Sequence, residues 1–186
     1  ELKVREWLVR GPDGVVLALI ERLDPPLDPP AGPGLGHAFN ATQTVRDMDK
    51  TIAFYQALGF DVLARHSGPL KDGGGAVLGL AIDEADSLAV ELAILSTNNE
   101  LNGSIELLAL AGRPGRDLSA ATGPGCLGLN IMRIPVRGLD ALCGDLQQNN
   151  RVIEKHARWE IQPYGLVHGI AVRTPDGAWL EFFEVE

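Results

Sequence analysis

Apolar residues along this chain follow two different periods, and the switches between them mark its predicted elements. Residues 40–47 (NATQTVRD) and 129–138 (LNIMRIPVRG) read as strands, and each is followed by a helix, over 47–60 and 139–149. In the first helix the apolar side chains lie three and four positions apart, Asp47 or Asp49 provides the N-cap, and Gly59 ends it. Each helix is then followed only by strands.

The elements after each helix complete a repeated plan. Three apolar-rich segments follow the first helix and three follow the second, and they read as strands over 60–67, 87–96, 103–111, 151–161, 166–174 and 178–186. The order β-α-β-β-β therefore occurs twice. We predict an α+β fold in which two such βαβββ modules pair, so that two mixed sheets form a curved cleft.

A repeated turn motif indicates a third copy of the hairpin. The segment WLVRGPDGVVLALIE near the start resembles IAVRTPDGAWLEFFE near the end, and both read as strand, Pro-Asp-Gly turn, strand. We expect the first hairpin to be the end of a preceding module that is missing from this sequence. In it, Ala18 takes the position that Glu181 has in the last hairpin. The predicted divisions are the hairpin 1–23, a Pro/Gly linker 24–37, a first module 38–113 and a second module 114–186.

Composition narrows the functional classes. The 186 residues are 45% hydrophobic and carry a net charge of −9, which argues against binding to nucleic acid or to anionic lipid. No apolar run approaches the roughly 20 residues of a membrane span. The two cysteines, Cys126 and Cys143, form no metal or disulfide pattern, so we expect a cytoplasmic protein.

Three motifs together resemble the vicinal oxygen chelate superfamily, which includes glyoxalase I, extradiol dioxygenases and bleomycin resistance proteins. They are VRDMDKTIAFYQALGFDV, GSIELLAL and VRTPDGAWLEFFE, and the resemblance covers nearly all of residues 38–186. It implies a site in the cleft between paired modules and a homodimer as the assembly. It is more specific for the fold than for the activity.

The resemblance also implies where metal ligands would lie. In that superfamily a glutamate in the fourth strand of a module binds the metal, and this position corresponds to Glu106 and Glu181. The other ligand stands five residues before the valine of the first strand, which is Asn40 in one module and Ile131 in the other. Isoleucine binds no cation and histidine is absent from both positions, although His37 lies three residues before Asn40. Two carboxylates and an amide would suit Mg or Mn better than Zn or Fe.

Other candidates surround these positions. Arg133 shares the face of Ile131, so it is predicted either to meet an anionic substrate or to form a salt bridge at the rim. Trp179 and Phe183 share the face of Glu181 and are predicted to line an apolar pocket or to pack in the core. His168 corresponds to the strand where ring-cleaving relatives carry an acid–base histidine, with packing as the alternative.

Two functions follow from these residues. The first is a metal-assisted lyase or isomerase acting on a small oxygenated molecule, in which Glu106 or Glu181 is catalytic and moves a proton. The missing histidines count against dioxygenase chemistry. The second is a metal-free protein that binds or sequesters a small molecule, as resistance proteins do. The two matched glutamates favour the enzyme, and an inert structural module is a third reading.

Overall fold

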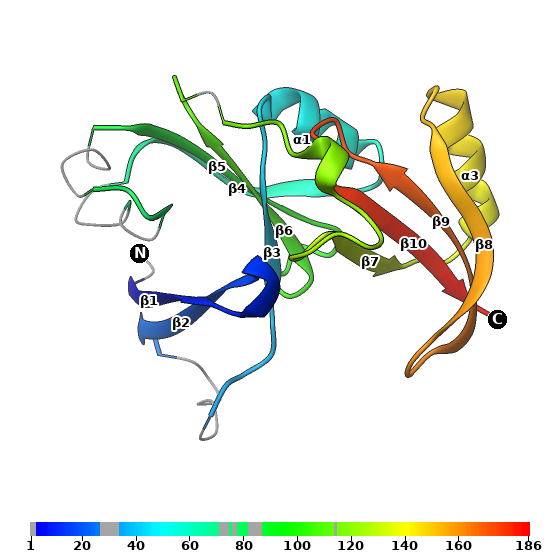
Figure 1. The fold of residues 1–186 in the computed structure, drawn as a ribbon, viewed down its shortest axis with the longest axis horizontal. Coiled ribbons are helices and arrows are strands. Elements are labelled where there is room, and N and C mark those ends of the chain that lie inside the picture. The colour runs from blue at the N-terminus through cyan, green and yellow to red at the C-terminus, as the bar shows by residue number, and fades with distance from the viewer. Residues whose placement is uncertain (1–2, 27–33, 71–74, 76–77, 82–86, 114) are drawn as a thin grey trace.

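A computed structural model describes the chain from Lys3 to Glu186, except residues 27–33, 71–74, 76–77, 82–86 and 114 (Figure 1). The first module consists of β3 (Asn40–Thr44), α1 (Met48–Gln56), β4 (Asp61–Pro69), β5 (Ala89–Ser96) and β6 (Ser104–Leu110). The second consists of β7 (Ile131–Pro135), α3 (Leu139–Gln148), β8 (Ile153–Ile161), β9 (Gly165–Arg173) and β10 (Trp179–Val185). The predicted α+β fold with two βαβββ modules is confirmed.

Each module forms a four-stranded mixed sheet with the same strand order. The orders are β3-β6-β5-β4 and β7-β10-β9-β8, and the first and last strands of each module pair in parallel. Because side chains alternate across a strand, one face of each sheet packs against its helix. Residues of both modules join there in one core, which includes Ile105, Leu107, Leu180 and Phe182. We call the opposite face of each sheet its site face.

The two helices begin in different ways. The carboxylate of Asp47 caps α1 by accepting a hydrogen bond from the Lys50 amide at 3.0 Å, as the sequence predicts. Helix α3 begins after Gly138, whose φ of 76° lies in the left-handed region. The carboxylate of Glu184 in β10 caps this helix. One of its oxygens accepts a hydrogen bond from the Gly138 amide at 2.7 Å, and the other accepts from the Leu139 amide at 3.2 Å. These two hydrogen bonds hold the pKa of Glu184 below its ordinary value.

The closing hairpin turn fastens the second module to the first. The carboxylate of Asp176 accepts hydrogen bonds from the Arg46 amide at 2.8 Å and from the Thr51 hydroxyl at 2.6 Å, at the start of α1. Beside it, Gln43 donates to Thr174 at 2.9 Å and accepts from buried Tyr55 at 2.8 Å. Burial raises the pKa of the Tyr55 hydroxyl, so this tyrosine stays a neutral donor. The inter-module contact is therefore a satisfied polar network.

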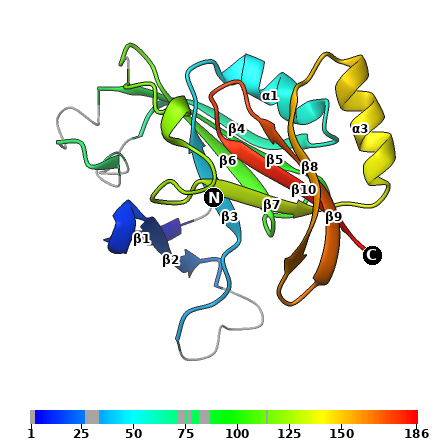
Figure 2. The ribbon, with the colours of Figure 1, turned by 45° about the vertical axis from the view of Figure 1, so that its right-hand side comes forward.

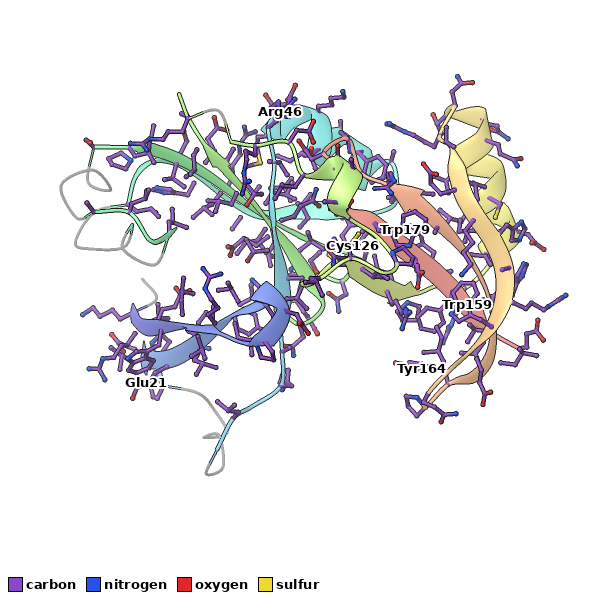
Figure 3. All side chains as sticks on the ribbon, viewed as in Figure 1. Glu21, Arg46, Cys126, Trp159, Tyr164 and Trp179 are labelled. Carbon is purple, nitrogen blue, oxygen red and sulfur yellow. The ribbon has the colours of Figure 1, made fainter. Side chains whose placement is uncertain are left out.

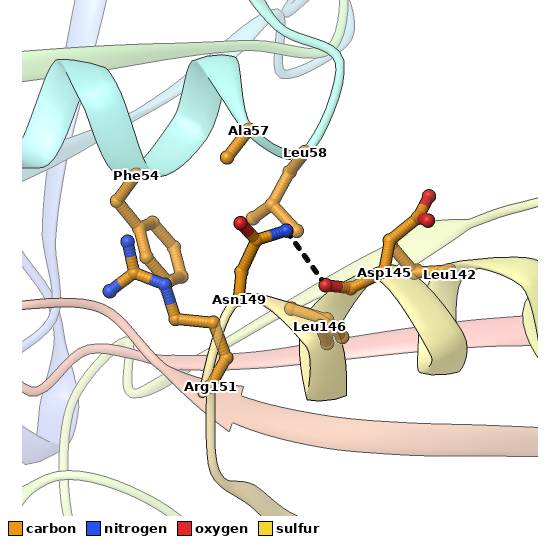
Figure 4. Close-up of a pocket in the computed structure, with 8 residues that line it drawn as sticks. All are labelled: Phe54, Ala57, Leu58, Leu142, Asp145, Leu146, Asn149 and Arg151. Atoms are coloured by element: carbon orange, nitrogen blue, oxygen red, sulfur yellow. Dashed lines mark hydrogen bonds between the residues drawn. The ribbon is translucent and has the colours of Figure 1, made fainter.

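A shallow hollow lies between the two helices (Figure 4). It is lined by Phe54, Ala57, Leu58, Leu142, Asp145, Leu146, Asn149 and Arg151. The guanidinium of Arg151 covers the ring of Phe54 at 5.1 Å, and Asn149 donates its side-chain amide to the Asp145 carbonyl at 2.8 Å. These contacts close the end of α3 and pack the helices together, on the helix side of both sheets.

The opening hairpin forms hydrogen-bonded strand pairs with neither module. It consists of β1 (Lys3–Arg10) and β2 (Val16–Asp24), joined by the turn η1 (Pro12–Gly14), and it forms a separate two-stranded sheet. Figures 1 and 2 show it on the side of the molecule away from α1 and α3. Residues 27–33 of the linker that follows lie outside the described residues. Neither α1 nor α3 has the length or apolar content to span a bilayer, and this holds for every helix in the described ranges.

Candidate functional site

Glu181 is the centre of the second module's site face. It lies on β10 next to Arg133 of β7, its direct partner in the parallel pairing. The Nε of Arg133 donates to one carboxylate oxygen of Glu181 at 2.7 Å, and the indole N–H of Trp179 donates to the other at 3.2 Å. Glu181 is only 3% exposed, so this charge is buried and paired.

Arg133 connects this buried carboxylate with the surface. Its side chain is 48% exposed, whereas that of Glu181 is 4% exposed. The ion pair uses the Nε, and the hydrogen bonds found among the described residues leave the two terminal nitrogens of the guanidinium without a partner. Arg133 therefore forms a salt bridge, with a partner that is buried and not at the rim, and keeps donors directed away from it.

A loop ahead of β7 borders the exposed end of Arg133. The guanidinium of Arg173 fixes the loop by donating to the carbonyl of Ser119 at 3.1 Å and to the hydroxyl of Thr122 at 2.8 Å. Gly123 then runs so close to Trp179 that an added Cβ would lie 3.4 Å from the ring. Figure 3 shows Cys126 of the same loop near Trp179.

The loop and β7 enclose an open groove of about 380 Å³. Its lining consists of Gly123, Gly125, Cys126, Gly128, Leu129, Asn130, Ile131 and Arg133. Glycine backbone, one exposed thiol, one amide and two aliphatic side chains line it, and Arg133 is the charged residue among the described lining. The groove thus combines polar and apolar surface in nearly equal parts with one cationic donor, a composition that fits a small amphipathic molecule.

The first module arranges its glutamate differently. Glu106 of β6 pairs in register with Thr42 of β3, whose hydroxyl donates to the carboxylate at 3.3 Å. Burial raises the pKa of Glu106, the Thr42 hydrogen bond lowers it in part, and the charge of Glu6 in the opening hairpin raises it further. Glu106 is therefore a partly buried carboxyl that binds its proton more tightly than an ordinary glutamate.

Two more polar side chains share this face of the first module. Asn40 pairs in register with Ser104, two residues before Thr42 and Glu106 respectively. The Ser104 hydroxyl is buried and has no hydrogen-bond partner in the described part of the structure. His37 lies outside this group and contacts the side chain of Asn102 at 2.9 Å.

The remaining predicted site residues lie in two places. Phe183 is 2% exposed and packs with Ile161 and Val167, while the ring of Tyr164 contacts it at a centroid distance of 5.2 Å. His168 pairs in register with Glu184, so it projects from the face opposite Glu181. Its Nε2 lies 2.6 Å from that of His156, and neither histidine is among the residues that line the groove.

The residues that the resemblance implies as metal ligands are divided between the two sheets. Asn40 and Glu106 belong to one sheet, whereas Glu181 belongs to the other and already pairs with Arg133. Within the described ranges, no group of three or more His, Cys, Asp or Glu side chains is placed to hold a metal ion. A guanidinium at 2.7 Å occupies the electrostatic position that a cation would take beside Glu181.

Sequence reasoning missed two parts of this region. Thr42 stands in the first module where Arg133 stands in the second, so the alternation that singled out Arg133 also contained the signal for Thr42. The groove wall over residues 123–130 gave no comparable signal, because its position depends on the anchoring of the loop by Arg173.

Comparison with solved structures identifies the fold. A glyoxalase family protein from Bacillus cereus matches with a TM-score of 0.65 at 20% identity, over 83% of this chain and 97% of that one. A glyoxalase/bleomycin resistance/dioxygenase domain from Frankia sp. EAN1pec matches at 0.53 and 22%, over 82% and 100%. A glyoxalase I variant from Zea mays matches at 0.53 and 17%, over 79% of this chain and 47% of that one.

No protein-family model matches the sequence, and no curated protein does. At these identities the structural matches establish architecture and leave chemistry open. The two modules of this chain therefore have the fold of the glyoxalase, bleomycin resistance and dioxygenase proteins, the group that the sequence resembles.

Proposed function

We propose that this protein binds a small anionic organic molecule in the groove beside Arg133, without a metal ion. The observation that carries the proposal is the half-exposed Arg133 side chain, which is held on one side by a buried carboxylate and directs its remaining donors to the groove. Glu181 acts here as a positioning residue, because it fixes the guanidinium and is itself nearly inaccessible.

The chemistry of the groove defines the class of ligand. A guanidinium recognises a carboxylate or phosphate oxygen through charge-assisted hydrogen bonds. The neighbouring Ile131 and Leu129 offer apolar surface, and Leu129 is 74% exposed. The glycines of the loop allow a ligand to approach the backbone closely. A small organic acid with an apolar body satisfies all three features.

The test is a binding screen in the presence of EDTA. Small carboxylates and phosphates are compared with their neutral amides or alcohols by ligand-observed NMR, and hits are measured by calorimetry. We expect acids to bind, neutral analogues to bind at least about tenfold more weakly, and the chelator to have no effect.

A paired variant separates recognition from stability. Replacing Arg133→Gln together with Glu181→Gln removes the cation without leaving a buried charge alone, and we expect binding to weaken by about tenfold or more. Arg137→Gln, which removes an arginine outside the groove, is the matched control. Equal binding by the double variant, or equal binding of neutral analogues, would contradict the proposal.

A second candidate function rests on Glu106. Its pKa is raised by burial, so it holds a proton at higher pH than an ordinary glutamate, and a carboxyl that takes and returns a proton is what a lyase or isomerase acting on an enolisable carbonyl compound needs. The buried Ser104 hydroxyl without a described partner lies on the same face and supplies an available donor. In this function Glu106 is the acid–base residue and Thr42 positions it.

This second function is tested by exchange of substrate protons with solvent. Panels of small hydroxy ketones and aldehydes in D2O are followed by NMR, with Glu106→Gln as the variant and Glu100→Gln as the control. Exchange that depends on Glu106 supports the enzyme. Exchange at the same rate in Glu106→Gln rejects it and leaves the binding function unaffected.

A further inference from the structure

The opening hairpin exposes apolar side chains on both of its faces. On one face Trp7 is 49% exposed and Leu17 is 50% exposed, and on the other Leu8 is 46% exposed and Ile20 is 41% exposed. The two strands pair only with each other among the described strands, so both outer edges carry unpaired backbone groups. An isolated two-stranded hairpin is marginally stable in water. This hairpin therefore needs a covering partner to be stable.

Its pairing register repeats that of the hairpin formed by β9 and β10. The two turns correspond through their Pro-Asp-Gly triplets, and the strands then match position by position in both arms. Corresponding pairs in the first and second hairpins are Arg10↔Val16 and Arg173↔Trp179, Leu8↔Ala18 and Ala171↔Glu181, and Val4↔Arg22 and Val167↔Val185. The likeness seen in the sequence thus extends to the register of every shared pair.

The match identifies one face of the opening hairpin as a core face. Trp7, Val9, Leu17 and Leu19 correspond to Ile170, Val172, Leu180 and Phe182, which are almost fully buried under α3. The cross-strand pair Trp7↔Leu19 replaces Ile170↔Phe182, so one aromatic and one aliphatic side chain are present in each case, on exchanged strands. Similar total volume on this face is what a common core requires.

We infer that the opening hairpin is the second half of a further βαβββ module, and that its Trp7 face binds a strand–helix–strand segment with the plan of β7, α3 and β8. The helix of that segment covers Trp7, Val9, Leu17 and Leu19. Its first strand adds in parallel to β2, and its second strand adds antiparallel to β1, as β7 and β8 do in the complete module.

One position of the hairpin limits which residue the partner segment can carry. Gly169 lies beneath the ring of Trp159, and an added Cβ there would approach the ring to 2.4 Å and the Phe182 carbonyl to 2.7 Å. The corresponding residue of the opening hairpin is Glu6, which has a long side chain. The second strand of the partner segment therefore carries a small residue where β8 carries Trp159.

The experiment builds this partner from the chain itself. A copy of residues 130–165 with Trp159→Ala in the copy is joined to Lys3, which reproduces the element order of the second module. We expect hydrogen exchange in residues 3–24 to slow by about tenfold or more and Trp7 fluorescence to shift to the blue, in a monomer. Leu17→Glu on the Trp7 face should abolish this protection, whereas Leu8→Glu on the other face should leave it.

Two outcomes would overturn the inference. In the first, residues 3–24 of the fused chain exchange as fast as in the unfused chain, while β9 and β10 remain protected in both. In the second, the unfused chain self-associates, its hairpin gains protection as concentration rises, and Leu17→Glu prevents both effects. That result would make a second copy of this chain the occupant of the Trp7 face.

Discussion

The two modules place a glutamate at the same point of the same strand and surround it in opposite ways. Glu181 accepts from the guanidinium of Arg133 at 2.7 Å and from Trp179, and it is 3% exposed. Glu106 accepts from the hydroxyl of Thr42 at 3.3 Å, and Glu6 adds a like charge. The shared fold thus fixes where the carboxyl lies, whereas the residue opposite it on the neighbouring strand determines its charge environment.

The difference gives the two glutamates different roles: Glu181 positions a neighbour, and Glu106 can exchange a proton. A buried carboxylate paired with an arginine orders that arginine, so Glu181 stabilises the arrangement of the groove. A partly buried carboxyl without a cation has its proton affinity increased, so Glu106 can exchange a proton at higher pH than a free glutamate. The three experiments below test this contrast, in order of decreasing expected effect.

Loss of Arg133 should give the largest effect. Arg133→Met leaves the buried Glu181 charge without its cation, and we expect the free energy of unfolding at pH 7 to fall by about 2 kcal/mol. The estimate is at the low end for buried pairs because Arg133 is half-exposed. Urea denaturation measures it, with Thr42→Val as the matched change in the first module and an expected loss below about 1 kcal/mol.

A double variant identifies the cause. If the unpaired charge is responsible, Arg133→Met combined with Glu181→Leu should recover most of the lost stability. A double variant as unstable as Arg133→Met alone would mean that lost packing explains the effect. Equal losses for Arg133→Met and Thr42→Val would remove the contrast between the modules.

Replacing each glutamate by glutamine should give effects of opposite sign. Glu181→Gln breaks the ion pair and should destabilise by about 1 kcal/mol at pH 7. Glu106 has a native pKa above 4.5, so the native state holds this proton more tightly and stability falls as pH rises above 4.5. Glu106→Gln removes that fall, so we expect it to match the unchanged protein below pH 4.5 and exceed it at pH 7.

Urea unfolding between pH 4 and pH 8 measures both variants under identical conditions. The gain from Glu106→Gln should remain below about 1 kcal/mol because solvent reaches part of the side chain. A Glu106→Gln curve parallel to that of the unchanged protein across this range would show that Glu106 titrates normally.

The order of elements and the site strands could be predicted from the sequence, because they depend on local signals. Alternation placed Arg133 on the face of Ile131 and Trp179 on the face of Glu181, an aspartate at 47 or 49 marked the start of α1, and Pro-Asp-Gly fixed both hairpin turns. These signals act within a few residues or between adjacent strands, where a period determines which side chains meet.

The sequence predicted less well which residues surround the two glutamates. The reading that both carboxylates and Asn40 form one metal site assumed that the two sheets bring them together, and that distance depends on how whole modules pack. His168 was chosen from its strand alone, yet the register with Glu184 places it on the opposite face from Glu181. The groove depends on hydrogen bonds between Arg173 and a loop some fifty residues away, which no local pattern encodes.

Thr42→Arg should give the smallest effect and the most direct test, because it places in the first module the residue that the second module has. A guanidinium at this position would face Glu106 across the same parallel register, and it should lower the pKa of that carboxyl toward or below 4.5. The pKa is read from an NMR titration of labelled glutamate carboxyls. Stability at pH 7 should rise by less than about 1 kcal/mol, since the pair would be partly exposed. Thr42→Gln adds length without charge and should leave the pKa of Glu106 raised. If the pKa of Glu106 stays high in Thr42→Arg, burial and the nearby Glu6 govern it, and the strand partner alone does not explain why the two glutamates differ.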